Sequence, residues 1–321
     1  MTETATQIWT TRRLLAWMNE AFTHNGLDSP RLMSEMILSH VLGCQRLRLY
    51  MEPDRPATEL ERNNLRDLVG RALKHEPVQY LVGEAWFFGL AFTVDKRVLI
   101  PRPATQTIVE YVLQHVRTAT GFGGASGDEV LFADICTGSS CIAVSLLYSM
   151  KLARAIATDI SEDAIAVARL NAIRHGVIDR VELLQGDLVA PLLAHPAAGA
   201  HESLHYIVSN PPYVPDDEWD AVEPNVKDHE PHLALRGGVD GLDFLRRLLE
   251  SSPPLLKPGG LLLVEIAEAR FKEAEALAAA HPMLESARIL NDLENKPRVL
   301  VAAKKGGSNG TGSNAIGPTH E

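Results

Sequence analysis

The tetrapeptide Asn210-Pro211-Pro212-Tyr213 has residue types, in an order, that point to the most specific chemistry in the chain. Two consecutive prolines fix φ and remove two backbone donors, so the segment becomes a rigid array of acceptors. The Asn210 carboxamide and the Pro211 carbonyl could accept both hydrogens of a planar NH2 group while the Tyr213 ring stacks on its face. The pattern predicts that all four residues bind substrate, with catalytic roles for Asn210, Pro211 and Tyr213. The alternative is a proline-rich turn that only ends a strand.

A run of small residues over 134–140 could let a ligand approach the backbone closely. It follows an apolar run at 130–135 and opens a helix expected over 139–150. Such a turn directs backbone N–H groups at a ligand, and an acid at the strand end can bind an ammonium or a hydroxyl group. The candidate binding residues are Asp134, Cys136, Thr137, Gly138, Ser139 and Ser140. A tight turn without a ligand is the alternative.

Two further acids stand where later strands are expected to end. Asp159 follows a strand expected over 155–158 and lies about 20 residues after the small-residue turn, the spacing at which an acid hydrogen-bonds ribose hydroxyls. Asp187, which Leu188 follows, comes after a strand expected over 181–184 and could receive an adenine amino group. The alternatives are an acid favoured by a helix dipole for Asp159 and a solvated loop carboxylate for Asp187.

The sequence points to neither a metal site nor an activated nucleophile. His229 and His232 lie in a proline-containing loop and are expected to be scattered surface histidines. The three cysteines, Cys44, Cys136 and Cys141, form no CxxC pair, which argues against a disulfide scaffold and a structural zinc site. The sequence has no Gly-x-Ser-x-Gly turn and no Walker loop, so it does not support acyl or phosphoryl transfer.

The elements that must position these residues follow a strand–helix alternation. Strands are expected at 130–135, 155–158, 181–184, 206–208 and 261–266, with two more strand-like runs at 287–290 and 299–302. Helices are expected between Ser161 and Gly176 and over 268–280. The alternation predicts an α/β fold with a parallel sheet covered by helices on both faces, and a ligand at the carboxyl ends of its strands.

The chain is expected to divide into four parts. Apolar stripes at helical spacing predict a small helical domain over 1–76. Aromatic and β-branched residues over 85–100 predict a hairpin within a linker at 77–105. The sheet domain is expected over 106–304, and the Gly- and Ser-rich tail over 305–321 is expected to be disordered.

The composition narrows the class of partner. The 321 residues carry a formal net charge of −10, which argues against a nucleic-acid backbone as the main partner. The N-terminus lacks a signal-peptide pattern, and no apolar run approaches the roughly 20 residues of a membrane helix. We therefore expect a cytoplasmic protein with no membrane partner. A monomer is assumed, since the sequence carries no signal for the oligomeric state.

The chain resembles the protein-(glutamine-N5) methyltransferases that act on bacterial peptide-chain release factors, over about residues 10–304. The resemblance is carried by EPVQYLVGEAWFFGLAFTVDKRVLIPRP at 76–103, DICTGS at 134–139, SNPPYVP at 209–215, DHEPHLALRGGVDGLDFLRRLL at 228–249, LKPGGLLLVEI at 256–266 and NDLENKPRVLVA at 291–302. Amino-methylating DNA enzymes share the tetrapeptide at 210–213. The linker and the block at 228–249 are more specific to the glutamine family.

The resemblance implies a Rossmann-like seven-strand class I methyltransferase domain, a helical domain that docks a class I release factor, and a hairpin linker. It implies S-adenosylmethionine as cofactor, S-adenosylhomocysteine as product, and no metal. It also implies that residues 136–140, Asp159, Asp187 and Leu188 line the cofactor pocket, with Asp134 and Asn210 beside them. Residues 210–213 would hold the glutamine of the release factor's Gly-Gly-Gln loop.

The sequence departs from the family pattern in three places. Ser140 stands where relatives usually carry Gly, in the turn that approaches the cofactor. Cys136 also replaces a common Gly. After the IPRP run, Ala104 and Gln106 stand where relatives usually carry acids, so two carboxylates near the expected cofactor entrance are lost.

The working hypothesis is a direct in-line transfer to an amide nitrogen held about 3 Å from an activated sulfonium methyl group. Hydrogen bonds to Asn210 and the Pro211 carbonyl would strengthen as positive charge develops on that nitrogen. Two alternatives stay open at this point. One is a methyltransferase for a ribosomal-protein glutamine or for the amino group of a flipped base. The other is an inactive binding module that keeps the fold.

Overall fold

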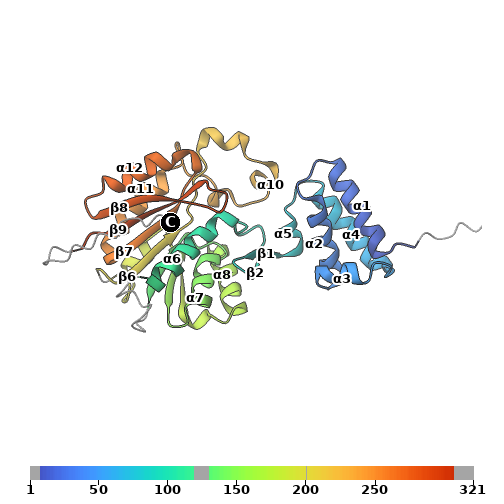
Figure 1. The fold of residues 1–321 in the computed structure, drawn as a ribbon, viewed down its shortest axis with the longest axis horizontal. Helices are drawn as coiled ribbons and strands as arrows, with labels where there is room; N and C mark the ends of the chain where they lie inside the picture. The colour runs from blue at the N-terminus through green and yellow to red at the C-terminus, as the bar shows by residue number, and fades with distance from the viewer. Residues whose placement is uncertain (1–7, 119–129, 200, 307–321) are drawn as a thin grey trace, which may run out of the picture.

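The computed structural model describes residues 8–118, 130–199 and 201–306, which form a helical part and a sheet part (Figure 1). A short hairpin lies between the two parts. The tail expected over 305–321 falls outside the described residues from residue 307 onward, and the Gly- and Ser-rich stretch at 119–129 falls outside them entirely. Within the described ranges, no helix is long and apolar enough to cross a membrane.

The helices of the N-terminal part share one apolar core. They are α1 Thr11–His24, α2 Pro30–Leu42, α3 Arg46–Met51, α4 Glu59–Ala72 and α5 Val78–Val82. Met18, Ile37 and Leu65 are fully buried in this core, as an apolar stripe at helical spacing predicts. Helix α4 begins at a capping box, in which the Thr58 hydroxyl accepts the Glu61 N–H while the Glu61 carboxylate accepts the Thr58 N–H. The box satisfies donors that the first turn of a helix leaves unpaired.

The hairpin between the two parts consists of β1 Glu84–Phe87 and β2 Leu90–Thr93, paired antiparallel. It lies in the region where the aromatic and β-branched run predicted it. Asn171 of α8 Glu162–Arg174 anchors it, because its Oδ1 accepts the Thr93 N–H at 2.7 Å and its Nδ2 donates to the Thr93 carbonyl at 3.0 Å. The same Nδ2 donates to the Ser139 carbonyl at 3.0 Å. One fully buried side chain therefore joins the hairpin, a helix and the small-residue turn.

In the described residues, seven strands form one sheet in the order β5-β4-β3-β6-β7-β9-β8. Their bounds are β3 Leu131–Ile135, β4 Arg154–Asp159, β5 Val181–Gln185, β6 Leu204–Ser209, β7 Leu256–Glu265, β8 Leu284–Asn291 and β9 Pro297–Lys304. The strands β3 to β7 pair parallel, whereas β9 pairs antiparallel with both β7 and β8. The predicted α/β sheet is confirmed, and it is mostly parallel. Its order switches at β3 and β6, where ligands of such sheets bind.

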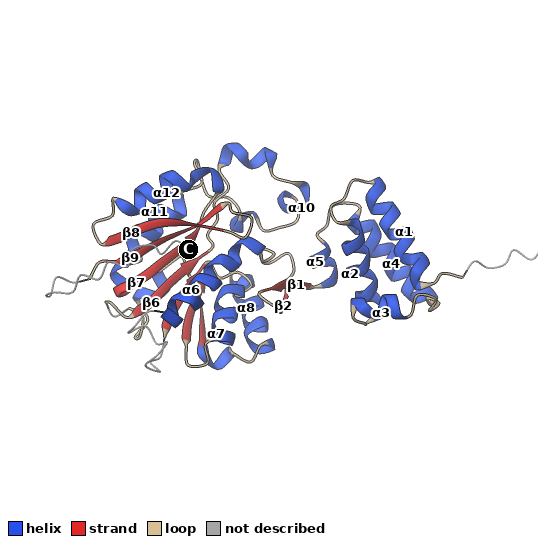
Figure 2. Cartoon of the chain, in the orientation of Figure 1, coloured by secondary structure: helices blue, strands red, loops and turns tan. Residues whose placement is uncertain are grey.

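Helices cover both faces of this sheet (Figure 2). Alternate residues of each strand point to opposite faces. On one face, Phe132 and Tyr206 pack with residues of α6 Gln106–Thr118, α7 Cys141–Ser149 and α8. On the other face, Ala133 and Ile207 pack with residues of α9 Ala190–Leu193, α11 Asp243–Ser251 and α12 Phe271–Ala279.

Several elements differ from the sequence prediction. The helix expected from residue 139 begins at Cys141, because Ser140 has a left-handed φ of 63° that cannot continue a right-handed helix. The helix expected over 268–280 is a 3-10 turn, Glu268–Arg270, followed by α12. Strand β7 begins at Leu256, earlier than expected, through the Pro258-Gly259-Gly260 run. Helices α6 and α11 were not assigned from the sequence.

Replacing Asn171 by Ala should destabilise the fold by about 3 kcal/mol, because the partly buried N–H and carbonyl of Thr93 and the buried carbonyl of Ser139 would lose their partners. The thermal midpoint should fall by roughly 6–12 °C for a domain of this size. Differential scanning fluorimetry measures the change. The control is Asn19→Ala, an exposed position on α1, which should move the midpoint by no more than about 2 °C. Equal midpoints for the two variants would refute the anchoring role of Asn171.

Candidate functional site

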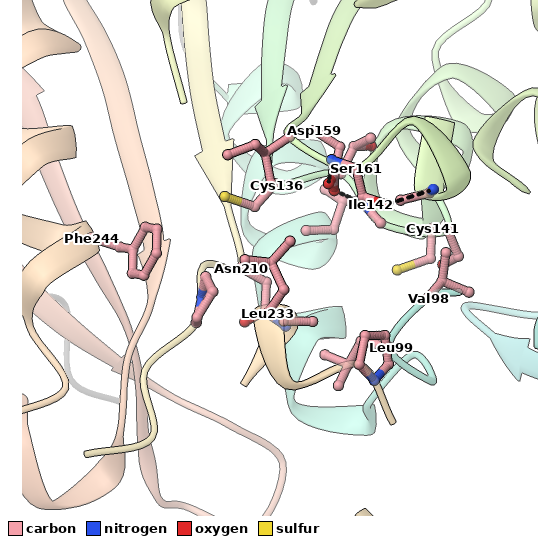
Figure 3. A pocket seen from close by; sticks show the side chains of 18 of the residues that line it. Val98, Leu99, Cys136, Cys141, Ile142, Asp159, Ser161, Asn210, Leu233 and Phe244 are labelled. Carbon is pink, nitrogen blue, oxygen red and sulfur yellow. Dashed lines mark hydrogen bonds between the residues drawn. The ribbon is translucent and has the colours of Figure 1, made fainter. Parts of the chain in front are cut away.

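A cavity of about 240 Å³ opens at the carboxyl ends of the parallel strands (Figure 3). Its walls come from the turn after β3, the end of β4, the loops after β5 and β6, and the linker residues Arg97, Val98, Leu99 and Pro101. Helix α11 adds Phe244 and Arg247. In Figure 3, Phe244 and Val98 stand at opposite sides of the cavity, with Asp159 and Asn210 between them. The cavity is therefore at the switch in strand order.

The turn after β3 is held in an unusual backbone conformation. Cys136, Gly138 and Ser140 have φ values of 59°, 53° and 63°. The Thr137 N–H donates to the Thr158 carbonyl at 2.9 Å, and the Ser140 N–H donates to the Thr137 carbonyl at 2.7 Å. Cys136, Thr137, Gly138 and Ser139 line the cavity. Left-handed φ at two non-glycine residues costs on the order of 1 kcal/mol each, so the surroundings must hold the turn in place.

Asp134 is the residue that holds the turn from behind. Its Oδ2 accepts the Thr137 hydroxyl at 2.7 Å and the Ala143 N–H of α7 at 3.1 Å. Its side chain is fully buried, and neither it nor Ser140 lines the cavity among the described residues. The expectation that this acid meets an ammonium or hydroxyl group directly therefore has no support in the geometry. Burial raises the pKa of Asp134 to about 7, although the hydrogen bonds from Thr137 and Ala143 oppose the shift.

Asp159 lies on the cavity wall at the end of β4. Its Oδ2 accepts the Gly138 N–H at 2.9 Å, and its Oδ1 accepts the Ser161 N–H at 3.0 Å. Ser161 in turn caps α8, because its Oγ accepts the Ala164 N–H. Burial raises the pKa of Asp159, and these backbone donors limit the rise. Each carboxylate oxygen keeps a further lone pair that a hydroxyl group of a ligand could use.

Asp187 and Leu188 follow β5 and also line the cavity. Asp187 is in an ion pair with Arg247 of α11, with 2.5 Å between Oδ2 and Nη2. Both side chains are about half exposed, so the pair contributes little to stability. The buried Leu188 accepts the Thr158 hydroxyl on its carbonyl at 2.8 Å. Asp187 therefore has one carboxylate oxygen committed to an arginine that the sequence did not single out.

Asn210 and Pro212 line the cavity directly after β6. The Asn210 Nδ2 donates to the Thr105 hydroxyl oxygen at 3.2 Å, and its Oδ1 is buried without a hydrogen-bond partner in the described ranges. A buried acceptor without a partner is costly, which is a reason to look for a ligand that supplies the hydrogen. The Pro211 side chain is buried behind the cavity wall.

The Tyr213 side chain contacts the end of β7 in this structure. Its hydroxyl donates to the Glu265 Oε1 at 3.3 Å, and among the described residues its side chain is not part of the cavity lining. Burial raises the pKa of Tyr213, so it stays a neutral donor at physiological pH. Its predicted stacking role stays a prediction, and the observed contact is with the end of β7.

The segment after Tyr213 is clamped against a glycine-rich stretch at 237–241. Val214 donates to the Leu235 carbonyl at 2.8 Å and accepts the Gly237 N–H at 2.8 Å. A Cβ at Gly237 would lie 2.6 Å from the Tyr213 Cα, and one at Gly241 would lie 2.4 Å from the Tyr213 carbonyl oxygen. Gly241 also has a φ of 77°, so no other residue fits there without strain.

Among the residues that the sequence did not single out, Thr105, Phe244 and Arg247 line the cavity, and Glu265 contacts Tyr213. Thr105 is the second residue after the IPRP run, and Glu265 ends β7. These positions indicated where the residues lie in the fold but not what they contact. The described residues contain no cluster of three or more metal-ligating side chains. His229 and His232 contact different backbone carbonyls, those of Lys74 and Lys227.

Comparisons with known proteins agree on one family. Residues 13–83 match the model of the PrmC N-terminal domain. The release factor glutamine methyltransferase of Chlorobaculum tepidum is 39% identical over 260 residues, 81% of this chain and 86% of that protein. The protein of the same name from Geobacter sulfurreducens is 40% identical over 81% of this chain and 85% of its own length.

A solved structure shares the fold. The hMettl16 catalytic domain, in complex with MAT2A 3′UTR hairpin 6, superposes with a TM-score of 0.52 over 81% of this chain and 87% of that chain. The sequence identity is 13%, so this likeness bears on the fold alone.

The raised pKa of Asp134 predicts a pH-dependent stability that Asp134→Asn should remove. Because the folded-state pKa is about 7 against an ordinary value of 3.8, folding favours the protonated acid, and wild-type stability falls as pH rises through that window. The shift corresponds to at most roughly 4 kcal/mol. The thermal midpoint of Asp134→Asn minus that of wild type should therefore increase from pH 5 to pH 8. The exposed-site control Asp179→Asn should show no such trend, and a flat difference for Asp134→Asn would refute the prediction.

Proposed function

The chain belongs to the release factor glutamine methyltransferase family, and from this membership we propose that it transfers a methyl group from S-adenosylmethionine to a glutamine of a class I peptide-chain release factor. The acceptor is the N5 side-chain amide nitrogen of the glutamine in the Gly-Gly-Gln loop. The observation that carries the proposal is the Asn210 carboxamide at the cavity. Its Nδ2 donates to the Thr105 hydroxyl, and its buried Oδ1 has no hydrogen-bond partner among the described residues.

The cavity residues fit S-adenosylmethionine, which supplies an electrophilic sulfonium methyl group when bound. Asp159 offers both carboxylate oxygens to ribose hydroxyls while its backbone contacts keep it in place. The turn at 136–139 brings backbone close to the ligand, as its tight left-handed geometry allows. Ile160, Leu188 and Phe244 offer apolar surface for a planar ring. Asp187 keeps one oxygen for an adenine amino group beside Arg247.

The tetrapeptide at 210–213 would act on the substrate amide. An amide nitrogen is a poor nucleophile, because its lone pair is delocalised into the carbonyl group. The Asn210 Oδ1 and the Pro211 carbonyl would accept its two hydrogens and hold the nitrogen toward the cofactor. Both hydrogen bonds would strengthen as positive charge develops on nitrogen, so they would stabilise the transition state more than the ground state. The surplus proton would leave the nitrogen after the methyl group has been transferred. Pro212 and Tyr213 would keep this array rigid.

The remaining roles follow from the same proposal. The helical domain would dock the release factor, and the sheet domain would carry the chemistry. The negative net charge suits a basic protein surface better than a nucleic-acid backbone. We propose a cytoplasmic monomer whose reaction product is S-adenosylhomocysteine and which needs no metal.

Incubation of the purified chain with methyl-labelled S-adenosylmethionine and a release factor should label the factor at the Gly-Gly-Gln glutamine. A copy of the factor with that glutamine changed to Ala is the control and should stay unlabelled. Peptide mass spectrometry locates the methyl group. Equal labelling of both factors would disprove the assigned acceptor. Labelling of ribosomal protein or nucleic acid instead of either factor would assign a different substrate.

Asn210→Ala should lower kcat by about 100-fold or more, because it removes an acceptor that matters most in the transition state. The dissociation constant for S-adenosylmethionine should change by less than about threefold, which isothermal titration calorimetry can measure. The control is Asn291→Ala at the exposed edge of β8, which should leave both values unchanged. Equal losses of turnover and cofactor affinity would count against this role.

Asp159→Asn should weaken S-adenosylmethionine binding by about tenfold or more, because a charged acceptor for hydroxyl donors is lost. The matched control is Asp163→Asn, an exposed acid in the first turn of α8. Isothermal titration calorimetry of both variants with S-adenosylmethionine shows whether the loss of affinity is specific to Asp159. Unaltered affinity in Asp159→Asn would remove Asp159 from the cofactor site.

A further inference from the structure

The charged residues of the cavity wall are unevenly placed. Among the described residues they are Arg97, Asp159, Asp187 and Arg247. Asp187 and Arg247 neutralise each other in their ion pair, and Arg247 lies on α11 three residues after Phe244. Val98, which follows Arg97 in the chain, stands on the side of the cavity opposite Phe244 (Figure 3). The cavity therefore has one end with a neutral ion pair and another end at which Arg97 supplies the charge.

Asp95 holds the Arg97 guanidinium in one orientation. The Arg97 Nε donates to the Asp95 Oδ1 at 2.8 Å and its Nη2 donates to Oδ2 at 2.6 Å, while Oδ1 also accepts the Arg97 N–H at 3.0 Å. The backbone is fixed as well, because the Val98 N–H donates to the Asp95 carbonyl at 3.0 Å and the Val98 carbonyl accepts the Tyr80 hydroxyl at 2.6 Å. A planar guanidinium bound along one edge keeps a second edge, formed by Nη1 and Nη2, for another acceptor.

The Asp95–Arg97 pair presents its cation to the cavity. In the described ranges Arg97 is part of the cavity wall, whereas Asp95 is not. The Arg97 side chain is about one third exposed, so a ligand can reach it. The other linker residues of the wall carry no charge; they are Val98, Leu99, Pro101 and Thr105. This end of the cavity therefore fits a ligand that ends in a carboxylate.

We propose that Arg97 binds the carboxylate of the amino-acid part of S-adenosylmethionine and makes the site selective for cofactors that carry this group. The inference rests on the proposed function, in which adenine lies beside Asp187 and Phe244 and the ribose at Asp159. The amino-acid part then extends toward the end of the cavity that Arg97 lines. A carboxylate that leaves water needs a cation and hydrogen bonds in exchange. The free guanidinium edge supplies both, since its two N–H groups match the two carboxylate oxygens.

The experiment measures the affinity of the full-length chain for S-adenosylhomocysteine and for its decarboxylated form, which keeps the ammonium group but lacks the carboxylate. Isothermal titration calorimetry gives both dissociation constants. The wild-type chain should bind S-adenosylhomocysteine about tenfold or more tightly than the decarboxylated ligand, because only the former makes the charge-assisted contact. Arg97→Ala should weaken S-adenosylhomocysteine binding by about tenfold or more and weaken binding of the decarboxylated ligand by less than about threefold. The preference between the two ligands should therefore disappear.

Two further variants serve as controls. Lys96→Ala removes one positive charge from the neighbouring exposed position, which is not part of the cavity wall in the described residues, and should keep the wild-type preference. Asp95→Asn combined with Arg97→Ala tests whether an unpaired Asp95 carboxylate, and not the missing guanidinium, is what disfavours the ligand. This double variant should lose the preference to the same extent as Arg97→Ala. Thermal midpoints verify that all variants are folded.

A wild-type chain that binds both ligands equally well would overturn the inference without the use of any variant. An Arg97→Ala chain that keeps the wild-type preference would overturn it too, as would a double variant in which the preference returns. These outcomes leave the proposed function intact, because S-adenosylhomocysteine is still bound and the labelling of the release factor does not depend on them. A wild-type chain that binds neither ligand would instead refute the proposed cofactor, and the inference with it.

Discussion

The parallel pairing of β3 with β6 is the constraint on which the site depends. Ile135 lies opposite Ser209 in this register, and the Ser209 hydroxyl donates to the Ile135 carbonyl at 2.8 Å. The next residues along each strand are Cys136 and Asn210, so the pairing brings the small-residue turn and the tetrapeptide to the same edge of the sheet. A shift of one residue would point their side chains to the opposite faces. The position of the cavity is therefore set by the strand register and not by any single side chain.

Buried carboxylates organise the segments around that edge. Asp134 holds the turn after β3, Asp159 joins that turn to β4, and Glu265 acts on the tetrapeptide through Tyr213. Glu230 joins the linker, since it accepts the Ile100 N–H and pairs with Arg102. Burial raises the pKa of each of these acids, which means that folding works against their charge. Such a cost is tolerated where acceptors must be fixed before a ligand arrives, because preorganised polar groups need no rearrangement during reaction.

The sequence was sufficient to predict the α/β fold, most of its strands and the family, because these depend on local periodicity and on contiguous motifs. It also predicted that Asp159 and Asn210 lie at one edge, since both directly follow strands. It did not predict the contact of Asn210 with Thr105 or of Tyr213 with Glu265, because these pairs are separated by 105 and 52 positions and meet only through sheet order. The inward orientation of Asp134 was missed for a related reason. Its side-chain direction depends on α7, whose first residue the pattern placed too early.

Two departures from the family pattern lie at strained positions of the backbone near the cavity. Cys136 and Ser140 stand at left-handed positions where glycine would be unstrained. Their effects differ because their side chains go to different places. Cys136 lines the cavity and so shapes its wall, whereas Ser140 is fully buried and its hydroxyl lies behind the turn. A side chain at 140 therefore does not narrow the cavity. The backbone strain at Ser140 instead lowers the stability of the fold. The contacts of Asp134 with Thr137 and Ala143 hold the turn against this strain.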